Sequence, residues 1–282
     1  MTEAIYIQAN TNQWIAARVA QFAIETRGRA RERGIPVTLM NVSQMPWFKA
    51  FAGVPFRRGS RMTTSDPDDV QSFTLSRFMP PELMGYAGRA LVIDPDVFAL
   101  ADVGDLFATD LKGNAIAACP RPDGWESSVM LLDCARLHHW RITHILAGLK
   151  NLTLDYSELI RLRAESQVVE LSPKWNSLDE IGSQPAMLHT TRNLTQPWKT
   201  GLPIDFRVPK PPPLFGLIPR EPLRRLLRKP VGIYLPHPRR EVEKVFMDLM
   251  RESLHAGALT DADIDHAIAH KFVRPDIRRH IA

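Results

Sequence analysis

The chain has 282 residues, 44% of them hydrophobic, and a formal net charge of +5. This composition excludes a disordered or fibrous protein and suffices for the core of one large domain, with or without an extension. No apolar run reaches the ~18 residues of a membrane span, and the N-terminus lacks the profile of a signal peptide, so we expect a cytoplasmic protein. Cys119 and Cys134 are too few for a disulfide framework and are predicted to be core thiols.

The first 42 residues predict a strand, a helix and a second strand. Residues 4–8 are mostly apolar and predict a strand, and the mainly polar residues 9–12 then form a predicted turn. Apolar residues recur at helical spacing over residues 14–33, and residues 36–42 again indicate a strand. Such a unit leaves a ligand crevice at the carboxyl ends of parallel strands.

The middle of the chain predicts strands interleaved with helices. Residues 45–64 are rich in glycine, proline and arginine, so we expect an irregular, mobile loop there. Asp66 and Pro67 predict the start of a helix that runs to about Arg77. Further strands are expected at 89–94, 115–119, 129–133, 168–171 and 186–189, and helices at 101–110 and from about 135. Together these segments predict an α/β sheet sandwich.

The strand at residues 89–93 ends on two carboxylates, Asp94 and Asp96, which flank Pro95. In extended chain, residues two apart point to the same side, so both side chains are expected to aim at one point beyond the strand. Two hard oxygen ligands suit Mg²⁺ or Mn²⁺, particularly where a phosphorylated ligand supplies further oxygens. The alternative is an acidic loop that only terminates the strand.

Two residues further along offer partners for such a site. His189 also ends an apolar run, and a neutral imidazole there is a candidate third metal ligand. Lys199 follows a turn formed by Pro197 and Trp198, from which its ammonium group could reach a phosphate. The alternatives are a hydrogen-bonded structural histidine and a turn packed by tryptophan.

The character of the chain changes after residue 203. Residues 208–213 are proline-rich and predict an extended spacer, so we divide the chain into a domain at 1–208 and a helical extension at 209–282. The extension is predicted to contain a helix at 239–255 and a last helix that begins with a capping box of Thr260 and Asp263. Its basic residues cluster at 220–229: Arg220, Arg224, Arg225, Arg228 and Lys229. This cluster is a candidate peripheral contact with an anionic membrane, and a solvated basic face is the alternative.

Five segments together resemble one known family. They are residues 76–96, which lead into Asp94 and Asp96, and residues 104–107, 125–134, 172–176 and 189–199. In sequence, order and rough spacing these segments resemble the GT-A fold glycosyltransferases related to glycosyltransferase family 8, including bacterial members, from residue 4 to about 205. The resemblance implies a GT-A mixed sheet flanked by helices.

The resemblance also implies a nucleotide diphosphate sugar as donor, with UDP as the expected nucleotide, bound through Mn²⁺ or Mg²⁺. Asp94, Asp96 and His189 match the three protein ligands of the metal. Arg77 matches the basic residue that faces the diphosphate. The residues that match the family's nucleoside-binding positions are Gln8, Ala9, Asn10 and Gln13. Family 8 members retain the anomeric configuration, so retention is carried over as an implication.

The chain departs from the family pattern at several positions. The spacing between His189 and Pro197 is one residue longer, the lysine position before Pro197 is Gln196, and Lys199 is the candidate replacement. The family has an Asp-Gln motif that is often placed under the sugar, and Asp155 is its only counterpart here. Glu126 lies near the position where a sugar contact is expected. Both are therefore candidate catalytic residues.

Two functions follow from these observations. The first is a metal-dependent glycosyltransferase that moves a hexose to an unknown acceptor. The second is a catalytically degenerate binding protein that uses its basic extension to engage a partner or a membrane surface. No nucleic acid partner is expected in either case.

Overall fold

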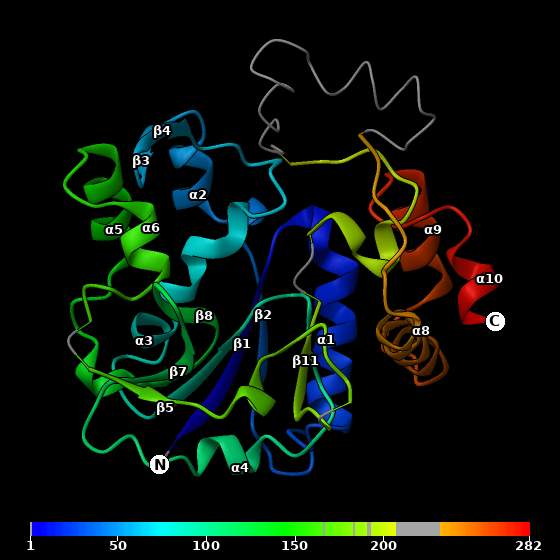
Figure 1. Ribbon diagram of the computed structural model, residues 1–282, viewed down its shortest axis with the longest axis horizontal. Helices are drawn as coiled ribbons and strands as arrows, with labels where there is room; N and C mark the ends of the chain where they lie inside the picture. Colours follow the sequence, from blue (N-terminus) through cyan, green and yellow to red (C-terminus); the bar gives the residue numbers. More distant parts are fainter. Residues whose placement is uncertain (1, 166, 183, 191–192, 207–231) are drawn as a thin grey trace.

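The computed structural model describes residues 2–165, 167–182, 184–190, 193–206 and 232–282 (Figure 1). Its centre is a six-stranded sheet with the order β2 (Val37–Asn41), β1 (Glu3–Ala9), β5 (Arg89–Ile93), β8 (Gly124–Asp133), β7 (Ile116–Arg121) and β9 (Val168–Glu170). β1 pairs in parallel with β2 and β5, whereas β8 runs antiparallel to both β5 and β7. The predicted mixed sheet is therefore confirmed.

The central strands are apolar over most of their length because both faces of the sheet are covered. Successive side chains of a strand point to opposite faces. Accordingly, Ile5 and Ile7 of β1 lie in one hydrophobic core, while Tyr6 lies in the other. Leu91 and Val92 of β5 are divided between the two cores in the same way. The sheet thus forms the middle of three layers.

Helices cover each face of the sheet (Figure 1). One face packs against α1 (Trp14–Thr26), α4 (Gly104–Phe107), α8 (Arg240–His255), α9 (Asp261–Ala269) and α10 (Ile277–Ile281). The other packs against α2 (Pro46–Phe51), the 3-10 helix Ser72–Phe78, α5 (Ile142–Lys150) and α6 (Tyr156–Ile160), and α3 (Pro80–Leu83) precedes β5. None of the helices in these described ranges is long and apolar enough to cross a membrane.

The C-terminal helices share a core with α1. Phe246 and Met250 of α8 belong to the same hydrophobic cluster as Ile5. The predicted capping box is confirmed at the start of α9, where the side chains and backbone of Thr260 and Asp263 bond reciprocally. The spacer, the basic cluster 220–229 and the proposed boundary at 208/209 lie outside the described residues, so the division into two domains stays a prediction.

Several predicted helices are shorter than the sequence indicates. α1 ends at Thr26, because the chain turns at Gly28 and continues through Arg29 with a φ of 57°. Residues 67–71 form turns that lead into the 3-10 helix Ser72–Phe78 in place of an α-helix. The helix expected from about 135 begins only at Ile142, after a single 3-10 turn at Cys134–Arg136.

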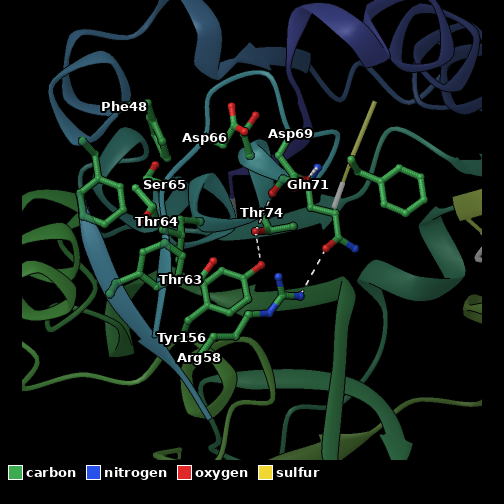
Figure 2. A pocket seen from close by; sticks show the side chains of 15 residues that line it. Phe48, Arg58, Thr63, Thr64, Ser65, Asp66, Asp69, Gln71, Thr74 and Tyr156 are labelled. Carbon is green, nitrogen blue, oxygen red and sulfur yellow. Dashed lines mark hydrogen bonds between the residues drawn. The ribbon is translucent and has the colours of Figure 1, made fainter. Parts of the chain in front are cut away.

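The prediction of an irregular loop at residues 45–64 is wrong. This segment contains α2 and an antiparallel hairpin of β3 (Pro55–Arg58) and β4 (Arg61–Thr64). The hairpin turns through Gly59, whose φ of +63° suits a two-residue turn. Together with Phe48 of α2 and Tyr156 of α6, the hairpin borders a small cavity (Figure 2).

A second, three-stranded sheet lies beside the first. Its order is β10 (Ser177–Leu178), β11 (Met187–His189) and β6 (Val97–Ala99), and β11 runs antiparallel to β6. β6 follows β5 after only three residues, 94–96. The link between the two sheets is therefore the segment that carries both predicted acidic ligands.

Candidate functional site

Asp94 and Asp96 lie in the turn that links β5 to β6. The prediction that they converge because the chain is extended is wrong, since Pro95 and Asp96 form a turn closed by a 3.3 Å hydrogen bond from Val97 N to Asp94 O. The histidine arrives through the second sheet, where His189 pairs with Val97 in register. A turn and an antiparallel pairing thus bring together residues that are 95 positions apart.

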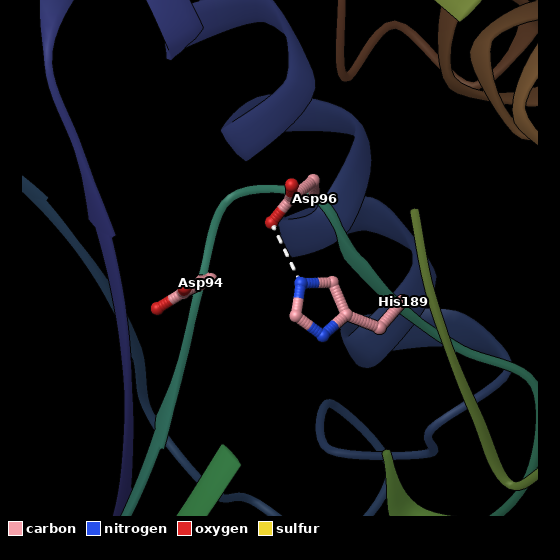
Figure 3. Close-up of side chains that lie close together, drawn as sticks. All are labelled: Asp94, Asp96 and His189. Carbon is pink, nitrogen blue, oxygen red and sulfur yellow. Dashed lines mark ion pairs between the residues drawn. The ribbon is translucent and has the colours of Figure 1, made fainter. Parts of the chain in front are cut away.

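The three predicted metal ligands converge (Figure 3). One ligand atom each of Asp94, Asp96 and His189 lies within 4.8 Å of the other two. His189 Nε2 is 3.5 Å from Asp96 Oδ1. The exposed fractions of the three residues are 9%, 7% and 7%, so all three polar groups are held at the edge of the core.

The orientation of His189 is fixed by a chain of buried hydrogen bonds. Asn176 Nδ2 donates to Ser128 Oγ at 3.0 Å, which leaves Asn176 Oδ1 as the acceptor for His189 Nδ1–H at 2.8 Å. The proton on Nδ1 is therefore used in this hydrogen bond, and Nε2 faces the carboxylates, where it can bind a cation once it is deprotonated. This is the arrangement that a metal-binding imidazole requires.

Asp94 has its own supporting partners. Arg77 Nη2 donates to both carboxylate oxygens, at 2.9 and 3.2 Å, and Gln8 Nε2 donates to Oδ1. Burial raises the pKa of Asp94 to about 6, although the charge of Arg77 opposes this increase. Burial disfavours the charged form of His189 too, but the neighbouring carboxylates of Asp96, Asp94 and Glu126 together outweigh it and raise the pKa of His189.

The donor set fits a divalent cation. Asp96 Oδ1 is buried and accepts no hydrogen bond from any residue that the structure describes. A buried carboxylate oxygen without a donor is costly unless a cation compensates it. Two carboxylates and an imidazole with a free lone pair suit Mn²⁺ or Mg²⁺, and the open side of the cluster leaves room for further oxygen ligands.

The cluster opens into a cavity of about 290 Å³. Six of the residues predicted from the sequence line it together: Gln13, Arg77, Asp94, Asp96, Glu126 and His189. Two buried polar atoms in its walls, Arg77 Nε and Gln13 Oε1, have no hydrogen-bond partner among the described residues. The walls of the cavity therefore contain an unpaired donor and an unpaired acceptor, both buried, beside the candidate metal ligands.

The remaining predicted residues lie outside the lining of this cavity. Gln8 and Ala9 are buried, and Gln8 acts on Asp94. Asn10 bonds to the backbone of Asp69 and to Ser72 and so holds the neighbouring loop in place.

The predicted lysine and the predicted acid both have structural partners. The Lys199 ammonium group is fully buried and bonded to the Asp205 carboxylate. Asp155 caps α6, where its carboxylate accepts hydrogen bonds from Ser157 N and Glu158 N, and it also accepts one from Gly59 N. The structure therefore brings neither Lys199 nor Asp155 to the cavity.

Other lining residues did not stand out in the sequence. Ser127 and Ser128 follow Glu126 within β8, and Tyr156 and Thr74 also line the cavity. Both serines lie in the segment 125–134 that carries the family resemblance, and Tyr156 directly follows Asp155, so a signal was present for all three. Thr74 gave none, because a threonine in a short polar segment is common in turns.

Comparison of the sequence with protein-family models gave no match, and comparison with curated proteins gave none either. Among solved structures, the glycosyltransferase GlyE of Streptococcus pneumoniae TIGR4 is similar, with 14% identity and a TM-score of 0.47; the match covers 72% of this chain and 58% of GlyE. The galactosyltransferase LgtC in complex with donor and acceptor sugar analogs has 15% identity and the same TM-score, over 70% of this chain and 89% of LgtC. Mouse xyloside xylosyltransferase 1 has 14% identity and a TM-score of 0.41, over 68% and 98% of the two chains. This chain thus spans less than two thirds of GlyE, and we base its function on the residues of the site itself.

Proposed function

We propose that this protein is a metal-dependent glycosyltransferase of the GT-A type, related to glycosyltransferase family 8, that transfers a hexose from a nucleotide diphosphate sugar. The observation that carries the proposal is the meeting of Asp94, Asp96 and a correctly oriented His189 at the mouth of one cavity that also contains Arg77. The sequence motifs around these residues support the same function.

In this proposal, each group at the site has a defined role. Asp94, Asp96 and His189 hold Mn²⁺ or Mg²⁺, and the bound cation would neutralise negative charge on the diphosphate. Arg77 has one nitrogen free to donate, so it stabilises the charge that develops as the nucleoside diphosphate leaves. Gln13 and Gln196, whose side chains bond to each other at 3.0 Å, flank the nucleoside, for which we propose uridine.

Glu126 is proposed to contact the donor sugar. Its carboxylate lines the cavity and forms a 2.7 Å ion pair with Arg121, which holds it in place. An ionised carboxylate accepts hydrogen bonds from sugar hydroxyls. Retention of the anomeric configuration belongs to this proposal as an implication of the family resemblance. We assign no catalytic role to Asp155 or Lys199.

Calorimetric titration with Mn²⁺ and UDP tests the proposal. The wild-type protein is expected to bind UDP only when Mn²⁺ is present and to hydrolyse one or more UDP-hexoses slowly. Asp96→Asn should weaken Mn²⁺ binding by more than about a hundredfold, because it removes a direct ligand while second-sphere changes alone cost 10- to 100-fold. Asp105→Asn, a change at an exposed aspartate of α4, is the matched control and should leave binding unchanged.

The outcomes separate the two candidate functions. Binding of Mn²⁺ and UDP without turnover of any donor would favour the degenerate binding protein. The same function is favoured by the structural roles of two predicted site residues: Lys199 pairs with Asp205, and Asp155 caps α6. The absence of Mn²⁺-dependent binding to UDP, GDP or their sugars would contradict the enzymatic function.

A further inference from the structure

A second cavity adjoins the first (Figure 2). It measures about 110 Å³ and lies between the β3–β4 hairpin, α2 and the start of α6. Arg58, Gln71, Thr74 and Tyr156 line both cavities, so these four residues form a shared wall. Any molecule in the second cavity therefore lies next to the occupant of the first.

The buried part of this second cavity is aromatic. Phe48, Phe51, Phe56 and Tyr156 are each less than 10% exposed, and the rings of Phe56 and Tyr156 are 5.6 Å apart. Most of its polar residues, among them Thr64, Asp66 and Asp69, lie between residues 63 and 72, and these side chains are partly or fully exposed. The buried part of the cavity is therefore mainly aromatic, and polar side chains line the rest of it.

Two polar groups of the floor already satisfy each other. Tyr156 OH and Thr74 Oγ1 are 2.6 Å apart, and Thr74 Oγ1 donates to the Gln71 carbonyl at 3.0 Å. The hydrogen of each hydroxyl is therefore in use, so neither of these two buried hydroxyls is free to donate to a ligand. Burying an unpaired hydroxyl is unfavourable, so the floor disfavours a sugar ring and favours an apolar one.

The size of the cavity points to a single ring. An apolar protein cavity of about 150 Å³ accommodates benzene, and this one is somewhat smaller but open on one side. Aromatic rings pack well against tilted aromatic walls. A single aromatic ring fits this space, whereas a larger polycyclic group does not.

Arg58 adds a charge at the shared wall. Its guanidinium group lies 4.7 Å from the centre of the Tyr156 ring, and Nη2 donates to Gln71 Oε1 at 3.3 Å. It forms no ion pair with a carboxylate in the described part of the chain. A nearby cation favours the ionised form of an acidic hydroxyl, and a phenol is such a group.

We propose that the second cavity is the acceptor subsite and that the acceptor is a compact phenol. This inference rests on the proposed function, since it names the acceptor class for the same reaction. The ring lies on the aromatic floor, and its hydroxyl points past Thr74 and Tyr156 towards the donor. The phenolic oxygen bonds to the anomeric carbon, the bond from that carbon to the diphosphate oxygen breaks, and the nucleoside diphosphate leaves with the electron pair. The proton of the phenol passes to the departing phosphate oxygen.

The hairpin offers a matched pair of variants for a test. Thr63 is the cross-strand partner of Phe56, so both side chains lie on the same face of the hairpin, towards the cavity. Met62 is the next residue, points to the opposite face and is 57% exposed. Thr63→Trp should therefore fill the cavity, whereas Met62→Trp adds the same side chain outside it.

The experiment measures two kinds of binding in each protein. Ligand-observed NMR reports binding of 4-methylphenol, with methyl glucoside as the comparison compound, and calorimetry reports binding of UDP with Mn²⁺. We expect the wild type and Met62→Trp to bind 4-methylphenol, and Thr63→Trp to bind it about tenfold more weakly or not at all. All three proteins should bind UDP with Mn²⁺ equally, which also shows that the variants are folded.

The result identifies which proposal fails. If UDP binds but 4-methylphenol does not, or if both tryptophan variants bind it equally, the acceptor subsite is wrong while the proposed function stands. If methyl glucoside binds in the phenol's place and Thr63→Trp blocks it, the acceptor class is wrong. If UDP and Mn²⁺ do not bind to the wild type, the proposed function itself fails.

Discussion

Two clusters of buried charge in this protein look alike in the sequence and differ in the structure. At the link between the sheets, Asp96 Oδ1 is buried without a hydrogen-bond donor among the described residues, and His189 Nε2 lies 3.5 Å from it. Beneath Pro197–Lys199, by contrast, the Lys199 ammonium group and the Tyr234 hydroxyl both donate to the Asp205 carboxylate.

The difference separates a binding site from a structural ion pair. Lys199 and Asp205 compensate each other, so this cluster gains nothing from a ligand. In the first cluster Arg77 pairs with Asp94 alone, Asp96 pairs only with the imidazole of His189 among the described residues, and both carboxylates border a cavity. An uncompensated buried charge next to open space therefore marks the site more reliably than the type of residue does.

The largest expected effect comes from breaking the closed cluster. Asp205→Asn leaves the buried Lys199 without its counter-charge and should lower the free energy of unfolding by about 3 kcal/mol, as measured by urea denaturation. Binding of Mn²⁺ and UDP should be unchanged. Asp265→Asn breaks an exposed pair with Arg278 and should cost less than about 1 kcal/mol. Loss of Mn²⁺ binding in Asp205→Asn would show that the two clusters are not independent.

The next effect concerns the support of the open cluster. Asn176→Leu removes the acceptor that orients His189 and should weaken Mn²⁺ binding by about 10- to 100-fold, measured by electron paramagnetic resonance of free Mn²⁺. Asn176→Asp retains an acceptor oxygen for Nδ1–H and should bind Mn²⁺ more tightly than the leucine variant does. Equal affinity in the two variants would contradict the orienting role of Asn176.

The pH dependence of the closed cluster provides a finer test. Burial lowers the pKa of Lys199 below its ordinary 10.5, and the Asp205 carboxylate partly offsets this effect. Asp205→Asn removes the offset, so the pKa of Lys199 in the folded variant falls further. At a pH between this lowered pKa and 10.5, the unfolded variant binds one proton more than the folded variant. The stability deficit of the variant should therefore shrink as the pH rises from 7 towards 10. A deficit that stays constant over this range would rule out a charged, unpaired Lys199 as its cause.

The smallest effect is expected at a purely local contact. Thr260→Ala removes the N-cap of α9 and should lower the free energy of unfolding by about 1 kcal/mol. Binding at either cavity should be unaffected. Thr109→Ala, outside any capping box, serves as the control and should change stability by less than about 0.5 kcal/mol. If the two variants lose equal stability, the capping box contributes nothing measurable.

Features governed by local patterns could be predicted. The strands β1, β5 and β8 follow from short apolar runs, and the capping box of α9 follows from the spacing of Thr260 and Asp263. The convergence of Asp94, Asp96 and His189 was also predicted from their places after apolar runs, although the extended-chain reason given for the two aspartates is wrong.

Features governed by distant contacts could not be predicted. The hairpin at residues 55–64 is rich in arginine and glycine, and it becomes regular only because Phe56 packs on Tyr156, 100 positions away. Nothing near Lys199 in the sequence distinguishes a phosphate ligand from an internal ion pair, since its partners are Asp205 and a tyrosine 35 residues later.

The sequence by itself determined the alternation of strands and helices and the chemical types of the groups at the strand ends, because both depend on neighbouring residues. Only the tertiary structure decided which of these groups remain uncompensated, because the pairing of buried charges depends on which side chains folding brings within a few ångströms. The same holds for the aromatic cavity, because its aromatic side chains come from α2, the β3–β4 hairpin and α6, which are far apart in the sequence.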